Sequence, residues 1–208
     1  MNTPTTYQEL LAFLLPPHKP APLLTPSTSA YSKTVNSHIS DLQLHPTLEA
    51  LLHLLNADLN SAHFLVRHMQ AAPKYEGMHL HALLHRIEGD YDNARAWYGD
   101  LAAKGGEAEC FVHAWKGGKE EEEAFVGRVQ ELRKGRNKKE RRDEAWENER
   151  KALEEISENE VRRLATWCED KFGTKAWGDA TSEWKEADEK TKDIQSKMTI
   201  GGEGWRNF

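Results

Sequence analysis

Six histidines lie within residues 53–85, and their spacing raises the question of metal binding. His81 and His85 are four residues apart, a spacing that places both imidazole rings on one face of an α-helix and lets them bind the same ion. His53 precedes His85 by 32 residues in a similar stretch of sequence, and His63 and His68 lie between the two stretches. One hypothesis is therefore a three-histidine site formed by His53, His81 and His85, for a transition metal such as zinc, in a metal-binding protein or a metal-dependent enzyme.

A structural role for the same histidines remains open as the alternative, with neutral, hydrogen-bonded rings lining the interior of a helical hairpin. The chain has no His-Glu-x-x-His or Cys-x-x-Cys motif, and no dense set of carboxylates flanks the histidines. Cys110 and Cys168 have no motif around them, and no Gly-x-Ser-x-Gly turn occurs. These features favour a protein that is not an enzyme and needs no cofactor, although residues distant in sequence can still assemble a catalytic site.

The helices that must position these residues are indicated by an internal repeat. Residues 51–70 and 83–102 align without a gap and share five identities in 20 positions. A period in the low thirties is typical of stacked helical hairpins. Apolar residues recur at helical spacing through most of the chain, and no segment alternates as a strand does. The sequence predicts an all-α protein of stacked antiparallel helical hairpins with a charged C-terminal helical region.

Residues 88–98, with the sequence EGDYDNARAWY, resemble the turn and second helix of a tetratricopeptide repeat. That family favours a Gly-Asp-Tyr turn followed by a small residue where the helices touch, here Ala94. The period of 32 departs from the 34 of the family, and the first helix lacks its full aromatic pattern. Residues 85–98 also resemble a family of fungal and bacterial proteins with a His-Arg-x-Glu-Gly-Asp-x-x-Asn-Ala-x-x-Trp-Tyr signature. Both resemblances imply a helical fold, and neither implies an activity.

The composition changes near residue 116. Residues 1–115 contain 7 of the 28 Lys and Arg residues, whereas all ten histidines lie before that point. We expect a short helix and a Pro-, Ser- and Thr-rich loop in residues 1–46, and tetratricopeptide-like hairpins in residues 47–115. A charged linker or solvated helix is expected in residues 116–145. Amphipathic helices carrying Trp177 and Trp184, docked on the hairpins, are expected in residues 146–208.

Stacked hairpins present a continuous concave face, so we expect the chain to bind a peptide or protein segment. Two repeats are fewer than the three that such stacks usually need, which suggests capping by the flanking helices or a homodimer. The expected binding surface comprises His53, His81, His85, Arg86, Glu88, Tyr91 and Trp97.

Charge and hydropathy restrict the other partners. The net charge of −6 argues against a general nucleic-acid binder, which needs a positive surface. Residues 133–142 hold seven basic residues in ten, a composition typical of nuclear localisation or phosphate contact, but acidic stretches flank them. No apolar run approaches the roughly 18 residues of a membrane span. We therefore expect no membrane partner. Because the two cysteines lie in separate regions and indicate no disulfide framework, we expect a cytoplasmic or nuclear location.

Overall fold

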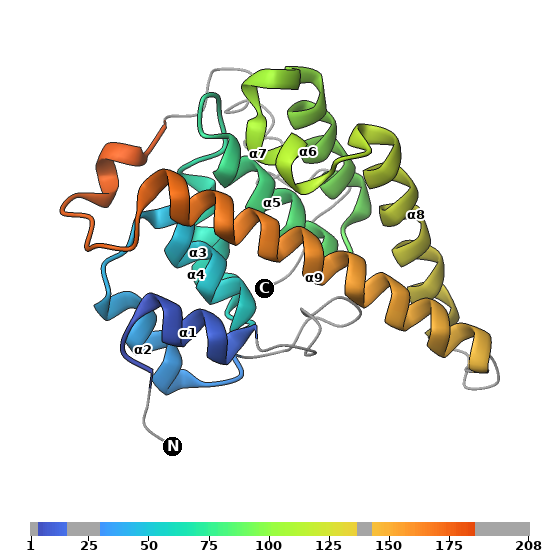
Figure 1. The fold of residues 1–208 in the computed structure, drawn as a ribbon, viewed down its shortest axis with the longest axis horizontal. Helices are drawn as coiled ribbons and strands as arrows, with labels where there is room; N and C mark the ends of the chain where they lie inside the picture. The colour runs from blue at the N-terminus through green and yellow to red at the C-terminus, as the bar shows by residue number, and fades with distance from the viewer. Residues whose placement is uncertain (1–3, 16–29, 137–142, 186–208) are drawn as a thin grey trace, which may run out of the picture.

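The computed structural model describes residues 4–15, 30–136 and 143–185, and within these ranges the chain is helical and contains no strand. Figure 1 shows the arrangement of the helices. In chain order they are α1 (Tyr7–Leu14), α2 (Lys33–Asp41), α3 (Pro46–Leu55), α4 (Leu59–Arg67), α5 (Tyr75–Glu88), α6 (Tyr91–Lys104), the 3-10 turn η1 (Gly105–Glu107), α7 (Glu109–Ala114), α8 (Gly118–Arg136), α9 (Glu144–Phe172) and the 3-10 turn η3 (Ala180–Glu183).

Helices α3 and α4 form the first helical pair, and local sequence sets its boundaries. Pro46 opens α3, where its missing N–H costs nothing, and the His45 imidazole accepts a hydrogen bond from the Thr47 N–H at 3.2 Å. The turn at residues 56–58 then leads into α4, which Asp58 caps by accepting from the Ser61 N–H. These local signals therefore set the start of each helix of the pair.

Helices α5 and α6 form the second pair. Gly89 ends α5 with a φ of 92°, a left-handed conformation that favours glycine, and Asp90 caps α6 through the Asn93 N–H. Helix α4 contacts α5, and α3 also contacts α5, so the two pairs pack side by side. Gly77 permits the approach of α5 to the end of α4, since a Cβ there would lie 2.7 Å from the Met69 carbonyl oxygen.

The 29-residue helix α9 runs across the molecule, as Figure 1 shows, and contacts α3, α7 and α8. A helix of this length extends about 43 Å at about 1.5 Å per residue. Leu153, Val161, Leu164 and Cys168 on one face of α9 are buried in a core shared with every helix before it. The core is therefore a single cluster to which residues from Tyr7 to Cys168 contribute.

Three expectations differ from the structure. Residues 33–41 form α2, whose Val35 and Ile39 are buried, where the sequence suggested irregular backbone. Residues 174–185 contain only η3 instead of an amphipathic helix, because Asp179 bonds locally to the Thr181 N–H and hydroxyl and favours a turn. Helix α8 is more than a solvated helix, since one face is buried through Phe125, Val126 and Val129.

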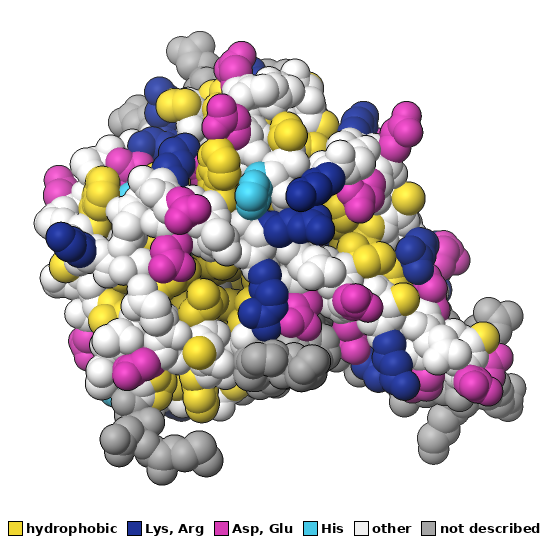
Figure 2. Space-filling model, in the orientation of Figure 1, with side chains coloured by type: hydrophobic (Ala, Val, Ile, Leu, Met, Phe, Trp, Pro, Cys, Tyr) yellow, Lys and Arg dark blue, Asp and Glu magenta, His cyan; other side chains and the backbone are white. Residues whose placement is uncertain are grey.

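The surface is mixed in charge. Acidic and basic side chains are interspersed over the face that carries α9 (Figure 2). One exposed ion pair links α8 to α9, in which Arg128 donates two hydrogen bonds of 2.8 Å to the Glu149 carboxylate. Among the described residues, no helix is both long enough and apolar enough to cross a membrane.

Candidate metal centre

Three imidazole rings meet where α4 packs on α5. His63 comes from α4, and His81 and His85 come from successive turns of α5. The Nε2 atoms of His63 and His81 are 3.2 Å apart, and one nitrogen from each of the three rings lies within 4.8 Å of the others. Three imidazoles from two packed helices form a donor set that suits zinc and leaves its fourth coordination position open.

Neighbouring side chains hold two of these rings in place. Trp97 of α6 stacks on His81 with ring centroids 4.6 Å apart, and His85 stacks on His81 at 4.7 Å. The Glu88 carboxylate lies 3.3 Å from Nδ1 of His85. A carboxylate behind a metal-binding histidine fixes its tautomer and makes the other nitrogen a better ligand. Trp97 therefore packs on the cluster, and Glu88 lies beside Nδ1 of His85, which has no hydrogen-bond partner among the described residues.

The cluster keeps His81 in the form that binds metals. Burial lowers the His81 pKa well below its usual value, and the neighbouring His85, His63 and Arg67 lower it further. His81 is therefore neutral at pH 7 and keeps a nitrogen lone pair for a ligand.

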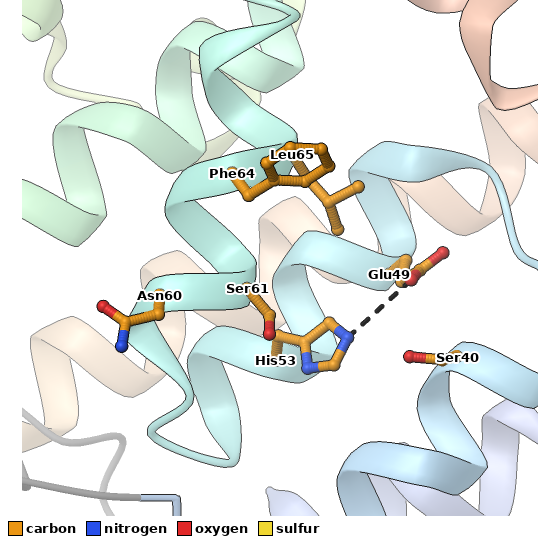
Figure 3. A pocket seen from close by; sticks show the side chains of 7 residues that line it. All are labelled: Ser40, Glu49, His53, Asn60, Ser61, Phe64 and Leu65. Carbon is orange, nitrogen blue, oxygen red and sulfur yellow. Dashed lines mark ion pairs between the residues drawn. The ribbon is translucent and has the colours of Figure 1, made fainter.

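His53 is not part of this cluster, which corrects the expected set of His53, His81 and His85. The helix that faces α5 is α4, so His63 occupies the third position. His53 lies instead beside a pocket between α2, α3 and α4, with its Nε2 3.7 Å from Glu49 (Figure 3). The repeat aligns His53 with His85 along the chain, but equivalent helices of a stack need not bring equivalent side chains together.

Arg86 was expected on the binding surface, but its side chain is fully buried. Its Nη1 donates to the Glu160 carboxylate of α9 and to the Tyr98 hydroxyl at 2.9 Å, and its Nη2 donates to Ser157 Oγ at 3.0 Å. The ring of Phe125 lies 4.8 Å from the guanidinium carbon. Arg86 therefore links α5 to the interior and offers no charge to a ligand on the surface.

Glu160 is the centre of this buried network. Its carboxylate accepts from His79 Nε2 at 3.1 Å, Tyr98 OH at 2.7 Å and Trp115 Nε1 at 3.1 Å, besides Arg86. Burial alone would raise the Glu160 pKa, but the Arg86 charge and the hydrogen bonds outweigh it and lower the pKa. Glu160 and Arg86 thus form a buried, hydrogen-bonded ion pair that joins α9 to α5, although Nε of Arg86 and Nδ1 of His79 have no hydrogen-bond partner among the described residues.

Glu122 of α8 lies close to this network, and its pKa is raised whereas that of Glu160 is lowered. Burial, followed by the nearby Glu160 charge, raises the Glu122 pKa to about 8, although Arg86 opposes the shift. Its Oε1 is buried and lacks a hydrogen-bond partner among the described residues. Glu122 therefore carries a proton at neutral pH.

Tyr91, another residue of the expected binding surface, packs against a residue of the basic run. Tyr91 packs under the Arg133 guanidinium at 5.6 Å, and Arg133 donates to the carbonyl oxygens of Arg86 and Ile87 at the end of α5. Arg133 thus caps a helix, and residues 137–142 of the basic run lie outside the described residues. Burial raises the thiol pKa of both Cys110 and Cys168, which are buried and protonated.

The fold and this cluster were compared with known proteins in three ways. No protein-family model matches the chain, and neither a curated protein nor a solved structure does.

Proposed function

We propose that the protein binds a transition metal ion, with zinc as the best fit, through His63, His81 and His85. The observation that supports this most directly is that one nitrogen of each ring lies within 4.8 Å of the other two. Tetrahedral zinc with Zn–N bonds of about 2.0–2.1 Å needs nitrogens about 3.3 Å apart. The 3.2 Å between Nε2 of His63 and His81 is close to that value, and small ring rotations would bring in His85.

The donor types narrow the choice of ion. Imidazole nitrogens suit zinc, copper, nickel and iron, whereas calcium and magnesium prefer oxygen ligands. Glu88 would serve behind His85 as a hydrogen-bond acceptor for Nδ1, which leaves Nε2 for the ion. The site would hold its ligands on packed helices, which limits their freedom before the ion arrives.

The test is zinc titration of protein purified without a histidine tag, with a chromophoric chelator as competitor. One equivalent should bind to the native protein, and His63→Ala, His81→Ala and His85→Ala should each lose most of that affinity. The exposed His113, which lies outside the cluster, provides the matched control His113→Ala and should bind as the native protein does. Equal zinc uptake by all four variants, or none by the native protein, would rule the proposal out.

An aromatic surface supports a second proposal, that the chain also binds a protein segment. The Phe64 and Trp184 side chains are 57% and 41% exposed, and both rings contact His68, at centroid distances of 4.9 Å and 4.2 Å. Large exposed aromatic side chains that cluster are typical of protein-binding surfaces. The side-by-side pairs α3–α4 and α5–α6 support a tetratricopeptide-like stack as the scaffold of this surface.

Affinity capture combined with cross-linking tests this second proposal. The double variant Phe64→Ser and Trp184→Ser should lose the partners that the native protein captures. Phe13→Ser removes an aromatic ring that is 52% exposed on α1 and serves as the control. Capture of the same partners by all three proteins would show that this surface is not the binding site.

A further inference from the structure

A pocket of about 400 Å³ lies between α2, α3 and α4, and none of the three clustered histidines lines it. Figure 3 shows Ser40 of α2, Glu49 and His53 of α3, and Asn60, Ser61 and Phe64 of α4 around it. Its lining combines oxygen acceptors with the apolar surface of Phe64 and Leu65. Among the described residues that line it, Glu49 is the only carboxylate and there is no lysine or arginine.

His53 is the unusual member of the lining. The residue is 3% exposed, and its Nδ1 has no hydrogen-bond partner among the described residues. Nδ1 lies 3.4 Å from Oδ2 of Asp58, and that carboxylate is fixed by Asn36 Nδ2 at 2.8 Å and Ser61 Oγ at 2.6 Å. An unsatisfied nitrogen on a buried imidazole is costly, and Asp58 is the acceptor nearest to a proton on Nδ1.

The two sides of the ring differ in what they face. Asp58 is the fixed acceptor on the Nδ1 side, so the proton of a neutral ring is favoured on Nδ1. Nε2 then presents a lone pair toward Oε1 of Glu49, 3.7 Å away (Figure 3). That separation is too long for a hydrogen bond between them. Two acceptors thus face the same part of the pocket, and a group with at least two N–H donors would satisfy both.

We propose that this pocket binds an alkylammonium group. Two of its N–H bonds would donate to Glu49 Oε1 and His53 Nε2, and the third would reach a hydroxyl or amide oxygen of the lining. The positive charge is matched by Glu49, and charge-assisted hydrogen bonds of this kind are stronger than neutral ones. The alkyl chain would lie on Phe64 and Leu65, where burying it excludes water from apolar surface.

The chemistry distinguishes this ligand from close analogues. A tetramethylammonium ion has the charge but no N–H donor, so it cannot satisfy Nε2 and Oε1. Butan-1-ol has a similar chain length but supplies one donor and no charge. A carboxylate would be repelled by Glu49. The alkylammonium group could belong to a free amine or to a lysine side chain, since both present the same atoms.

The test uses the full chain at fixed pH 7, with binding followed by chemical-shift perturbation and calorimetry. Butylamine should bind the native protein, whereas tetramethylammonium and butan-1-ol should bind at least about tenfold more weakly. Glu49→Gln should weaken butylamine binding by a similar factor, and Glu49→Asp should recover part of it. Glu120→Gln, which removes an exposed carboxylate from α8, should change nothing and controls for net charge. Thermal melting establishes that each variant is folded.

Two further arms complete the experiment. Cadaverine and Nα-acetyl-lysine methylamide are compared, and the tighter ligand identifies a free amine or a lysine side chain as the source. His63→Ala should bind butylamine normally, which separates this site from the proposed metal centre. The proposal is overturned if butylamine does not bind the native protein, if Glu49→Gln binds it unchanged, or if butan-1-ol binds equally well.

Discussion

Arg86 of α5 and Glu160 of α9 form an ion pair whose side chains are 0% and 1% exposed. The pair joins residues 74 positions apart, and Tyr98, Ser157, His79 and Trp115 form further hydrogen bonds with it, while Nε of Arg86 has no hydrogen-bond partner among the described residues. Because both charges have lost their hydration, each depends on the other. The interior is therefore stable only when α9 packs against the other helices and brings Glu160 to Arg86.

The first prediction concerns this pair. Glu160→Gln leaves the Arg86 charge buried without its counter-ion and should destabilise the protein by about 3–5 kcal/mol. Arg128→Gln breaks the bidentate ion pair with Glu149, whose side chains are 45% and 37% exposed, and should cost at most about 1 kcal/mol, because water screens exposed pairs. Urea unfolding followed by tryptophan fluorescence measures both. Similar losses in the two variants would show that Arg86 is not isolated from water.

The second prediction concerns the pH dependence of stability. The Glu122 pKa is about 8 in the folded protein, above the roughly 4.3 of an unfolded glutamate. The folded state therefore binds this proton more tightly, and the resulting stability is complete below pH 4.3 and is lost as the pH rises through 8. Relative to Glu122→Gln, the native protein should lose about 4 kcal/mol between pH 5 and pH 8.5.

Urea unfolding of the two proteins at several pH values gives this difference directly. Other titrating groups are common to both proteins, so their contributions cancel. A stability difference that does not change with pH would mean that water reaches Glu122.

The third prediction concerns the contact between α5 and the end of α4. Gly77→Ala places a methyl group against the Met69 backbone and should destabilise the protein by about 1–3 kcal/mol through overpacking. Gly99 lies inside α6 with nothing within 4 Å of an added Cβ, so Gly99→Ala should stabilise by about 0.4–1 kcal/mol. Thermal melting should move in opposite directions for the two variants, and a shift in the same direction would contradict the packing described for Gly77.

The fourth prediction concerns zinc and stability. A ligand that binds only the folded protein stabilises it by about 2.7 kcal/mol at a free concentration of 100 times Kd. Zinc should therefore raise Tm in the native protein and leave it unchanged in His81→Ala, and magnesium should have no effect in either. The rise should shrink at pH 5, because protons compete for the imidazoles. An equal rise in both proteins would indicate binding elsewhere.

Local signals in the sequence predicted the helical class and most helix boundaries. Gly89, Asp90 and Gly173 end or cap helices as their residue types favour. Pro46 opens α3, and the helix at residues 75–88 has the predicted bounds. These features depend on a few neighbouring residues, so one sequence is enough to place them.

The site depends on contacts that no local pattern contains. The spacing of His81 and His85 placed them on one face, but the third ring was set by which helix packs against α5. Arg86 was assigned to the surface because an arginine is seldom buried, and its partner Glu160 lies in a helix that the sequence treats as a separate region. Tertiary packing decided both cases.

Helix α9 is synthesised after the helices on which it packs, and this order affects when the protein can fold. A ribosome synthesises α3 to α8 before α9, so the nascent chain reaches residue 136 while Arg86 still lacks the Glu160 carboxylate. The two helical pairs therefore cannot complete their interior until residues 144–172 have been synthesised. Productive folding waits for α9, and a chain interrupted before residue 144 would expose its incomplete core to the quality-control machinery of the cell.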